Sequence, residues 1–273
     1  YATIGSRNDI HTTAGDEQSY RATIAYKLDN NSKFRVSYGT GFLFPALYEG
    51  HSYGWSNAAS KDSVNAEKTA SFDLGYETYF DSLNLDFNIT YFDIDIEDPI
   101  VGWTNAQENG KGNNTSRGIE IATNWTDNKK LNIGFNYIAT DSYSGLDCDK
   151  PNKNANGYNS CIDSNNGIID NAMVRVPLHA ISSKIDYKLN KDLNTSLLLK
   201  YRGQTRDYGG TDQGFKDQLL DEYLLVDLLS SYNLSEGYKL NFSVKNVFDK
   251  DYENSFKYTG LSRTMNIGLK KNF

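Results

Sequence analysis

The sequence predicts an all-β protein, a transmembrane antiparallel up-and-down β-barrel of which about twelve strands are present. Two observations support this fold class. Apolar and polar residues alternate with a period of two in segment after segment, and the connections between segments alternate between tight turns and long polar stretches. The sequence has no apolar run of about 18 residues, the length that a membrane-spanning helix needs, so a helical membrane protein is excluded.

The alternation is clearest from Tyr20 to Leu28, where even positions are apolar and odd positions are mostly polar. Such a segment forms a strand with one apolar and one polar face. An opening strand is expected near 2–6. The same split recurs at 34–38, 72–76, 83–91, 119–125, 131–137, 185–189, 197–201, 224–232, 240–244 and 265–269.

Turn lengths give the orientation of the predicted barrel. Five connections are tight and polar, at 29–32, 81–82, 126–129, 190–192 and 235–237. Six are longer, at roughly 9–18, 43–64, 98–115, 141–173, 207–216 and 248–260. Short turns at one end and long loops at the other are typical of an outer-membrane barrel, with the short turns on the periplasmic side. A soluble barrel would place its apolar face inward and would rarely need a dozen strands.

The polar face is expected to line the lumen, because a charge at the bilayer midplane costs about 2–4 kcal/mol. Its charged members are Arg21, Lys27, Arg35, Asp73, Glu77, Asp86, Glu120 and Asp227. The alternation slips at Tyr91–Phe92, after which the apolar residues occupy the other face. This slip predicts a β-bulge above the bilayer.

Composition narrows the function. A net charge of −7 and a sequence pI of about 5.0 argue against nucleic acid as a partner. Aromatic residues are dominated by tyrosine, with 20 Tyr against 13 Phe and 3 Trp, as membrane–water interfaces favour. Glycine loops that bind phosphate, CxxC pairs and HExxH motifs are absent from the sequence. None of the three histidines occurs with a serine and an aspartate in the chain order of a known catalytic triad. We therefore expect no enzymatic activity.

Four segments, taken together, resemble the TonB-dependent outer-membrane receptors. Tyr38-Gly39-Thr40-Gly41-Phe42, followed by Pro45, is similar to the family's strand-to-loop box, and Glu67-Lys68-Thr69 to its Pro-Glu-Lys-Ser segment, with Ala66 in place of the proline. Ser116-Arg117-Gly118-Ile119-Glu120 matches a Ser-Arg-Gly-Val-Glu strand start. Asn246-Val247-Phe248-Asp249-Lys250-Asp251-Tyr252 matches the Asn-Leu-Phe-Asp-x-x-Tyr element before the final strand.

The resemblance implies that residues 1–273 are the C-terminal portion of a barrel of about 22 strands, from which the plug domain and the N-terminal strands are absent. The sequence starts at Tyr1, inside a predicted strand, which suggests a processed or truncated N-terminus. Members of the family lie in the bacterial outer membrane, in contact with its lipids. They couple to the TonB–ExbB–ExbD complex through an N-terminal region and take up a small metal chelate. The resemblance favours cobalamin slightly over a ferric siderophore or haem, and implies no cofactor.

The C-terminus carries a second resemblance. Gly268 and the terminal Phe273 are similar to the sorting signal that the barrel assembly machinery reads. Lys271 departs from that pattern, since the position is usually apolar.

Candidate ligand-binding residues lie in the long predicted loops. His51, with Tyr53 and Trp55, occupies the loop where haem receptors of the family place a histidine ligand, although a solvated loop histidine is the simpler interpretation. His179, at the top of a strand, is expected to be structural. Aromatic side chains that are able to contact a large planar or macrocyclic ligand are Trp103, Tyr143, Tyr158, Tyr208 and Phe215.

One loop suggests two further features. Cys148 and Cys161 are the only cysteines, and in an oxidising compartment they would form a disulfide; two thiols without a nearby histidine make a poor metal site. The same loop is acidic, with Asp147, Asp149, Asp163 and Asp170. Calcium prefers oxygen ligands, but the spacing is not that of an EF-hand, so a solvated loop without metal is favoured.

Two alternatives to a receptor remain. The chain is either a passive porin that closes a barrel of about twelve strands by itself, or one half of a barrel completed by another chain. An open sheet alone would leave two unpaired edges in lipid.

Overall fold

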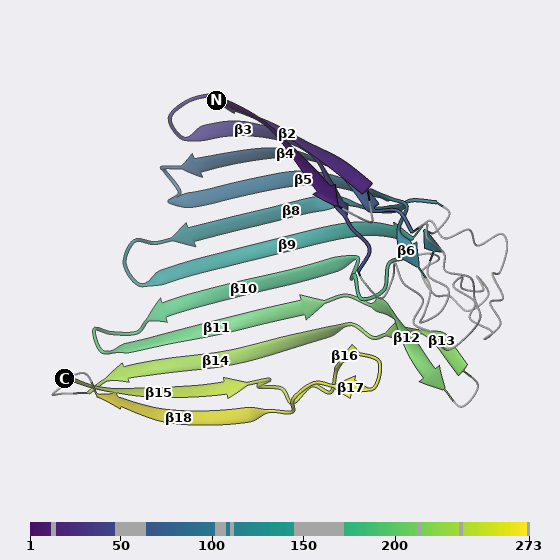
Figure 1. Cartoon of the computed structure of the whole chain (residues 1–273). Coiled ribbons are helices and arrows are strands. Elements are labelled where there is room, and N and C mark those ends of the chain that lie inside the picture. Colours follow the sequence, from purple (N-terminus) through teal and green to yellow (C-terminus); the bar gives the residue numbers. More distant parts are fainter. Residues whose placement is uncertain are drawn as a thin grey trace.

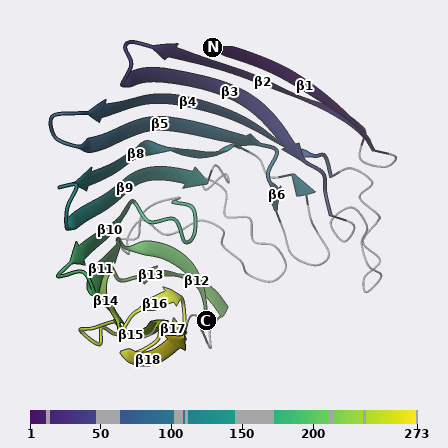
Figure 2. The same cartoon turned by 90° about the vertical axis from the view of Figure 1, so that its left-hand side faces the viewer.

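A computed structural model describes residues 1–11, 15–46, 64–101, 108–109, 112–144, 172–211, 214–234 and 237–271. Within these residues, twelve strands form one antiparallel sheet whose spatial order follows the sequence (Figure 1). The sheet curves, so that it has a concave and a convex face (Figure 2). No helix among the described residues is long and apolar enough to cross a membrane. The predicted all-β, up-and-down architecture and the strand number are confirmed.

The main sheet consists of β1 (Ala2–His11), β2 (Gly15–Lys27), β3 (Ser32–Leu43), β4 (Glu67–Phe80), β5 (Leu85–Glu97), β8 (Asn114–Thr126), β9 (Leu131–Ser144), β10 (His179–Lys188), β11 (Leu193–Arg202), β14 (Tyr223–Asn233), β15 (Tyr238–Lys245) and β18 (Thr264–Lys271). Three two-stranded hairpins interrupt this order. They are formed by β6 (Ile100–Val101) with β7 (Glu108–Asn109), β12 (Thr205–Thr211) with β13 (Gly214–Leu220), and β16 (Glu253–Ser255) with β17 (Tyr258–Thr259).

The strand registers place the predicted apolar faces of the main strands on one side of the sheet, except at the end of β5 that follows Tyr91. Phe34 on β3 is paired with Tyr76 on β4, and their ring centroids are 4.9 Å apart. Large apolar side chains on this face are exposed, including Ile24 at 59% and Ile267 at 75%. The buried apolar side chains among the described residues are Ala66, Ala172, Leu220, Val226 and Val244. An apolar exterior with so small a core is expected of a barrel wall that contacts hydrocarbon.

The four predicted tight turns that the structure describes in full lie together at one end of the sheet (Figure 1). Side-chain caps close three of them. Asp29 Oδ1 accepts hydrogen bonds from the backbone N–H groups of Asn31 and Ser32. Asp127 and Asn190 do the same in the turns after β8 and β10. A short polar side chain that binds its own following backbone is a common device for such turns.

The predicted loop 9–18 is wrong. β1 continues to His11 and β2 begins at Gly15, so that Asp9 pairs with Glu17 inside the ladder. Apart from Ile10, the paired residues of this segment are polar or small on both faces, which is why the period-two pattern did not reveal the strands. Above the hydrocarbon layer a strand needs no apolar face, and backbone pairing alone extends the hairpin.

The predicted bulge at Tyr91–Phe92 is also wrong. β5 pairs with both neighbours without a register shift from Leu85 onward. The backbone therefore stays regular, while the apolar side chains switch from the convex to the concave face after Tyr91. Phe92, Ile94 and Ile96 point to the concave side. Leu28, Leu83 and Leu189, which the pattern placed in strands, lie just beyond strand ends.

Candidate functional site

The concave face carries an ion-pair lattice on β3, β4 and β5. The carboxylate of Glu77 lies 2.8 Å from Lys33 Nζ and 3.0 Å from Arg35 Nε. Arg35 then crosses β4 and donates from Nη2 to Thr90 Oγ1 on β5, at 2.9 Å. Its side chain lies on Gly75, where a Cβ would come 2.7 Å from Arg35 Nε. Gly75 therefore allows one arginine to link three strands.

The strand registers place the residues that were predicted to face the lumen on one face of the sheet. Arg21, Lys27, Asp86 and Glu120 share the concave side with this lattice. Asp73 accepts a hydrogen bond from Ser37 Oγ at 2.8 Å. The eighth predicted residue, Asp227, has a structural partner, since its Oδ1 accepts from the backbone N–H of Asn246 at 2.8 Å.

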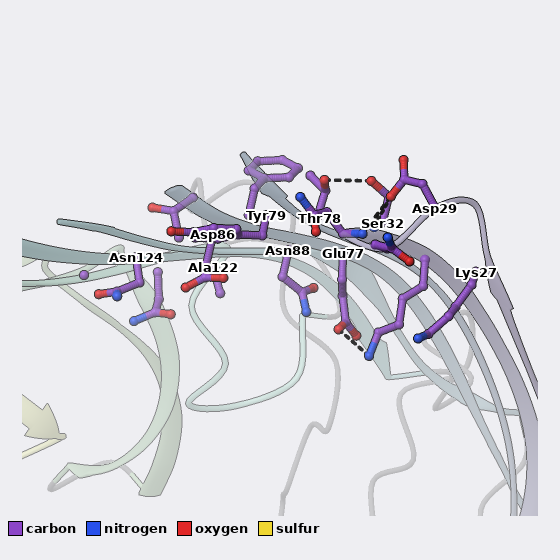
Figure 3. Close-up of a pocket in the computed structure, with 17 residues that line it drawn as sticks. Lys27, Asp29, Ser32, Glu77, Thr78, Tyr79, Asp86, Asn88, Ala122 and Asn124 are labelled. Carbon is purple, nitrogen blue, oxygen red and sulfur yellow. Dashed lines mark hydrogen bonds and ion pairs between the residues drawn. The ribbon is translucent and has the colours of Figure 1, made fainter. Parts of the chain in front are cut away.

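A groove of about 650 Å³ is hollowed into the concave face near the tight turns (Figure 3). Lys27 and Glu77 stand at one side of it, and Ala122 and Asn124 at the other (Figure 3). Its other lining residues on this face include Lys33, Asp86, Asn88, Gly134 and Asn136.

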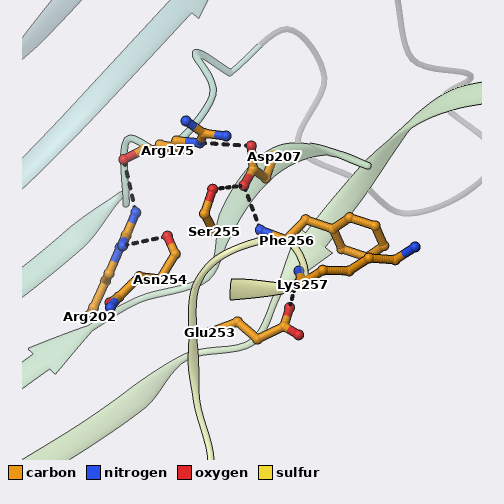
Figure 4. Close-up of polar contacts among 8 residues, drawn as sticks. All are labelled: Arg175, Arg202, Asp207, Glu253, Asn254, Ser255, Phe256 and Lys257. Carbon is orange, nitrogen blue, oxygen red and sulfur yellow. Dashed lines mark hydrogen bonds and ion pairs between the residues drawn. The ribbon is translucent and has the colours of Figure 1, made fainter. Parts of the chain in front are cut away.

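At the opposite, loop-bearing end, a second polar cluster forms around Asp207 (Figure 4). Asp207 is fully buried, and its Oδ1 lies 2.9 Å from Arg175 Nε. Its Oδ2 accepts hydrogen bonds from Ser255 Oγ and from the backbone N–H of Phe256, both at 2.8 Å. One carboxylate thus joins the segment before β10, the β12 strand and the β16–β17 hairpin.

Arg175 is held in an unusual backbone conformation in this cluster. Its φ is +64°, a left-handed value that non-glycine residues rarely adopt. Its N–H donates to the Arg206 carbonyl at 2.7 Å, and its carbonyl accepts from Arg202 Nη2 at 3.0 Å. The surroundings therefore fix the residue against backbone strain. The side chain of Arg175 remains 58% exposed, so its guanidinium is accessible beyond the bond to Asp207.

The β15–β18 connection, residues 246–263, folds over the end of the sheet as a strap. Arg202 Nη1 donates to the Asn254 carbonyl at 3.2 Å, and Tyr223 Oη donates to Asn254 Oδ1 at 2.8 Å. Arg202 on β11 and Tyr223 on β14 are registered partners, and both occupy positions whose side chains face the concave side. The rings of Tyr223 and Tyr252 are 4.7 Å apart. The strap therefore covers part of the concave face at the loop-bearing end.

The Asn246-to-Tyr252 motif shapes this strap. Asn246 is buried with φ +49°; its Nδ2 donates to the carbonyls of Lys250 and Leu261, and its Oδ1 accepts from the Lys250 N–H. Asp249 Oδ1 accepts from the Arg263 N–H at 2.7 Å. Tyr252 covers Gly260, where a Cβ would lie 1.9 Å from its Cζ. Phe248 is 73% exposed. The motif thus folds a loop.

The other motif residues also have structural positions. Glu67 Oε1 accepts the backbone N–H of Ile100 at 2.6 Å, which ties the β5–β8 connection to the start of β4. Gly41 lies opposite Thr69, whose Oγ1 would be 2.8 Å from a Cβ there. Phe42 and Pro45 flank Phe44, and the Phe42 and Phe44 ring centroids are 5.0 Å apart.

Arg117 and Gly118 lie on opposite faces of β8. Arg117 Nε lies 3.6 Å from Asp141 Oδ2 on the convex face, and Gly118 faces the concave side. Gly268 lies in β18 with open space where a Cβ would be. Lys271, which departs from the sorting pattern, places Nζ 4.7 Å from the Tyr238 ring centroid. That contact accommodates a cation beside the apolar face.

Most predicted ligand-binding residues lie outside the described residues. These are His51, Tyr53, Trp55, Trp103 and Tyr158, together with Cys148, Cys161, Phe273 and the four loop aspartates. Tyr143 lies in β9 and is 45% exposed, on the same parity as the convex-face Tyr137. Tyr208 and Phe215 belong to β12 and β13, of which only the backbone is described at these positions. The ligand-binding assignments therefore stay predictions.

His179 begins β10, and its Nδ1 hydrogen bonds with Tyr137 Oη at 2.9 Å. Within the described ranges, no group of three or more His, Cys, Asp or Glu is placed to hold a metal ion. The sequence interpretation missed Arg175, Arg202 and Asp207. No motif marks them, because their proximity arises only when three segments distant in sequence meet.

Comparison with known proteins gives a consistent result. The family model "TonB dependent receptor-like, beta-barrel" matches residues 2–247. The ferric enterobactin receptor of Pseudomonas aeruginosa is 23% identical over 269 residues, covering 91% of this chain and 35% of the relative. The probable TonB-dependent siderophore receptor PirA of Acinetobacter baumannii is 21% identical over 283 residues, covering 90% of this chain and 36% of the relative. The chain thus spans about a third of the length of these curated relatives.

Solved structures share the fold. The crystal structure of PirA matches with a TM-score of 0.74 at 17% identity, over 100% of this chain and 43% of that chain. The ferric-catecholate import receptor Fiu of Escherichia coli K12 matches with a TM-score of 0.73 at 19% identity, over 95% of this chain and 35% of that chain.

Proposed function

The chain belongs to the TonB-dependent receptor-like β-barrel family of the bacterial outer membrane, and from this premise we propose that it forms the C-terminal part of the barrel of a ferric-siderophore receptor. The observation that most directly supports this proposal is the twelve-stranded sheet, which matches siderophore receptors along nearly all of its length. An open sheet needs further strands before both edges are paired in lipid. Those strands, and a plug inside the barrel, belong to the proposed complete receptor.

A ferric catecholate is the proposed ligand, in place of the cobalamin that the sequence resemblance had placed first. The names of the relatives support this change, since they include receptors for ferric enterobactin and ferric catecholates. The accessible guanidinium of Arg175 supports it chemically. A ferric catecholate presents anionic oxygen atoms, and arginine binds oxyanions through several N–H groups at once.

Energised uptake requires partners beyond this chain. We propose that the complete receptor couples to the TonB–ExbB–ExbD complex and that the barrel assembly machinery inserts it. The family's use of a plug makes a passive porin the weaker second candidate, and a barrel completed by another chain the third. A stable open-channel conductance of the purified receptor would favour the porin.

The direct test compares ligands in cells that express the complete receptor and lack their own catecholate receptors. We expect saturable binding and energy-dependent uptake of ferric enterobactin, and neither for cyanocobalamin or haemin. Arg175→Ala should weaken ferric enterobactin binding about tenfold, as loss of a charge-assisted hydrogen bond does. Arg117→Ala is the matched control, because Arg117 faces outward and pairs with Asp141.

Two outcomes would overturn parts of the proposal. Binding of cyanocobalamin or haemin with no binding of ferric enterobactin would reject the ligand class. Equal effects of the two arginine variants would reject the role of Arg175 while leaving the ligand class intact.

A further inference from the structure

We propose that the ferric chelate crosses the barrel along one sector of its wall, on the side of the groove that Ala122 lines. This inference rests on the proposed function and adds the route to it. The two flanks of this groove differ: one carries the long charged side chains of Lys27, Lys33 and Glu77, and the other carries short side chains that include Ala122 (Figure 3).

The asymmetry appears in a single cross-strand row of concave-face residues. Each member is the registered partner of the next on the neighbouring strand, and we call this set the Ala122 row. It runs Lys27, Lys33, Glu77, Asn88, Ala122, Asn136, Ser182 and Lys200, from β2 to β11. The row begins with long charged side chains, becomes short over four strands, and ends with a lysine.

In the charged part of the row, Lys33 and Glu77 are held by ion pairs. Glu77 pairs with both Lys33 and Arg35, and Arg35 is anchored on Thr90. Side chains that are held by ion pairs and hydrogen bonds across three strands do not move aside easily. This flank of the groove is therefore harder to reshape around a bulky solute than the flank of short side chains.

The short part of the row forms the other flank of the groove. Ala122 and Asn136 both line the 650 Å³ groove near the tight turns. They also line a second hollow of about 340 Å³ that extends to Ala180 on β10. The two hollows therefore meet at Ala122 and Asn136 and lead from mid-wall towards the turn-bearing end.

The side chains that line this flank of the groove are suited to letting the chelate pass and not to binding it tightly. Asn88, Asn124 and Asn136 present neutral amides, which exchange hydrogen bonds with a hydrated solute. Glu77 is paired with two cations, and the other two carboxylates along the path, Asp86 in the groove and Glu120 in the second hollow, do not attract an anionic chelate. A conducting path must bind its solute weakly enough to release it, and amides on a small-residue floor meet that condition.

A steric test uses the complete receptor with radioactive ferric enterobactin as the probe. Ala122→Trp fills the floor where the two hollows meet. Ala25→Trp is the matched control, since Ala25 shares the concave face, pairs with Arg35 and lines neither hollow. Binding is measured on ice without energy, and the initial uptake rate in warm, energised cells. Both are normalised to folded receptor at the cell surface.

We expect Ala122→Trp to leave the binding affinity within about twofold and to lower the uptake rate about tenfold or more, with less than about a twofold change for Ala25→Trp. Ala122→Leu adds a smaller side chain and is used if the tryptophan variant does not assemble. It should give an uptake rate between those of the wild type and Ala122→Trp. Wild-type uptake by the Ala122 variants, or equal loss in both sectors, overturns the inference. Wild-type cells that bind no ferric enterobactin overturn the proposed function itself, and this route with it.

Discussion

The ring of Phe92 lies over the backbone of its registered partner Gly118. A Cβ at position 118 would come 2.7 Å from Phe92 Cζ and 2.0 Å from the Ala139 carbonyl oxygen. The motif glycine of β8 is thus explained by the Ala139 carbonyl and by an aromatic ring that β5 directs inward. The same contact shows why the polarity change at Tyr91–Phe92 needs no bulge.

Gly118→Ala is expected to destabilise the barrel by about 1–3 kcal/mol, as overpacking does. The measurement is urea-induced unfolding in detergent or lipid vesicles. Gly5→Ala is the control, because nothing lies within 4 Å of a Cβ there. Adding Phe92→Ala should restore only part of the loss, since the Ala139 carbonyl stays in place. Full restoration by Phe92→Ala would show that the ring alone causes the effect.

Asp207→Ala should loosen the strap. The change leaves Ser255 Oγ–H and the Phe256 N–H without their carboxylate acceptor. Hydrogen bonds to charged groups contribute about 1.5–3 kcal/mol, so hydrogen exchange of the Phe256 amide should accelerate about tenfold or more. Asp207→Asn keeps an acceptor oxygen and should give a smaller increase. Unchanged exchange at Phe256 in the alanine variant would contradict the role of Asp207.

The turn after β8 should weaken in acid. The backbone N–H groups of Leu131 and Lys129 donate to the Asp127 carboxylate and hold its pKa below the ordinary value. Because the pKa is lower in the folded than in the unfolded state, the stabilisation is complete above the unfolded value. It is lost as the pH falls below about 4 through the folded value. The protection of the Leu131 amide against hydrogen exchange should fall in this range.

Asn190 provides a natural control for that titration. It caps the turn after β10 through the same kind of contact, with Oδ1 2.9 Å from the Leu193 N, but its amide does not titrate. Protection of the Leu193 amide should stay constant over the same pH range. A parallel fall at Leu193 and Leu131 would assign the effect to general acid unfolding instead of Asp127.

Cys148 and Cys161 remain predicted to form a disulfide in the oxidising periplasmic and extracellular environment. The intact mass of the receptor after alkylation should rise by two alkyl groups only when a reductant is added first. Closing a loop of this length stabilises a chain by about 3 kcal/mol in the loop-entropy model. Alkylation of both thiols without reductant would reject the bond.

Phe273→Ser should lower the amount of assembled receptor in the outer membrane, because the terminal aromatic resembles the signal read by the barrel assembly machinery. Immunoblotting of outer-membrane fractions, with heat-modifiable mobility as the measure of folding, checks this. Lys271→Leu should not lower it, since an apolar residue restores the usual pattern. Wild-type levels in the Phe273 variant would count against the signal.

The sequence alone determined the architecture. Side chains of a strand alternate between lipid and lumen, so a period-two pattern identifies each strand and its faces wherever hydrocarbon demands an apolar side. Turn residues such as Asp29 and Asp127 act on their own following backbone, and local chemistry of this kind is visible in sequence. The family motifs were visible for the same reason, since each is a continuous segment.

Tertiary structure decided what the pattern did not constrain. Beyond the hydrocarbon layer, the β1–β2 hairpin extends by backbone pairing between polar residues, and the strap folds inward over the sheet. Asp207 is buried because three distant segments converge on it, and the Ala122 flank of the groove has short side chains because four such residues come into one register row. Such contacts depend on register and chain reversal, which join residues far apart in sequence and leave no periodic trace.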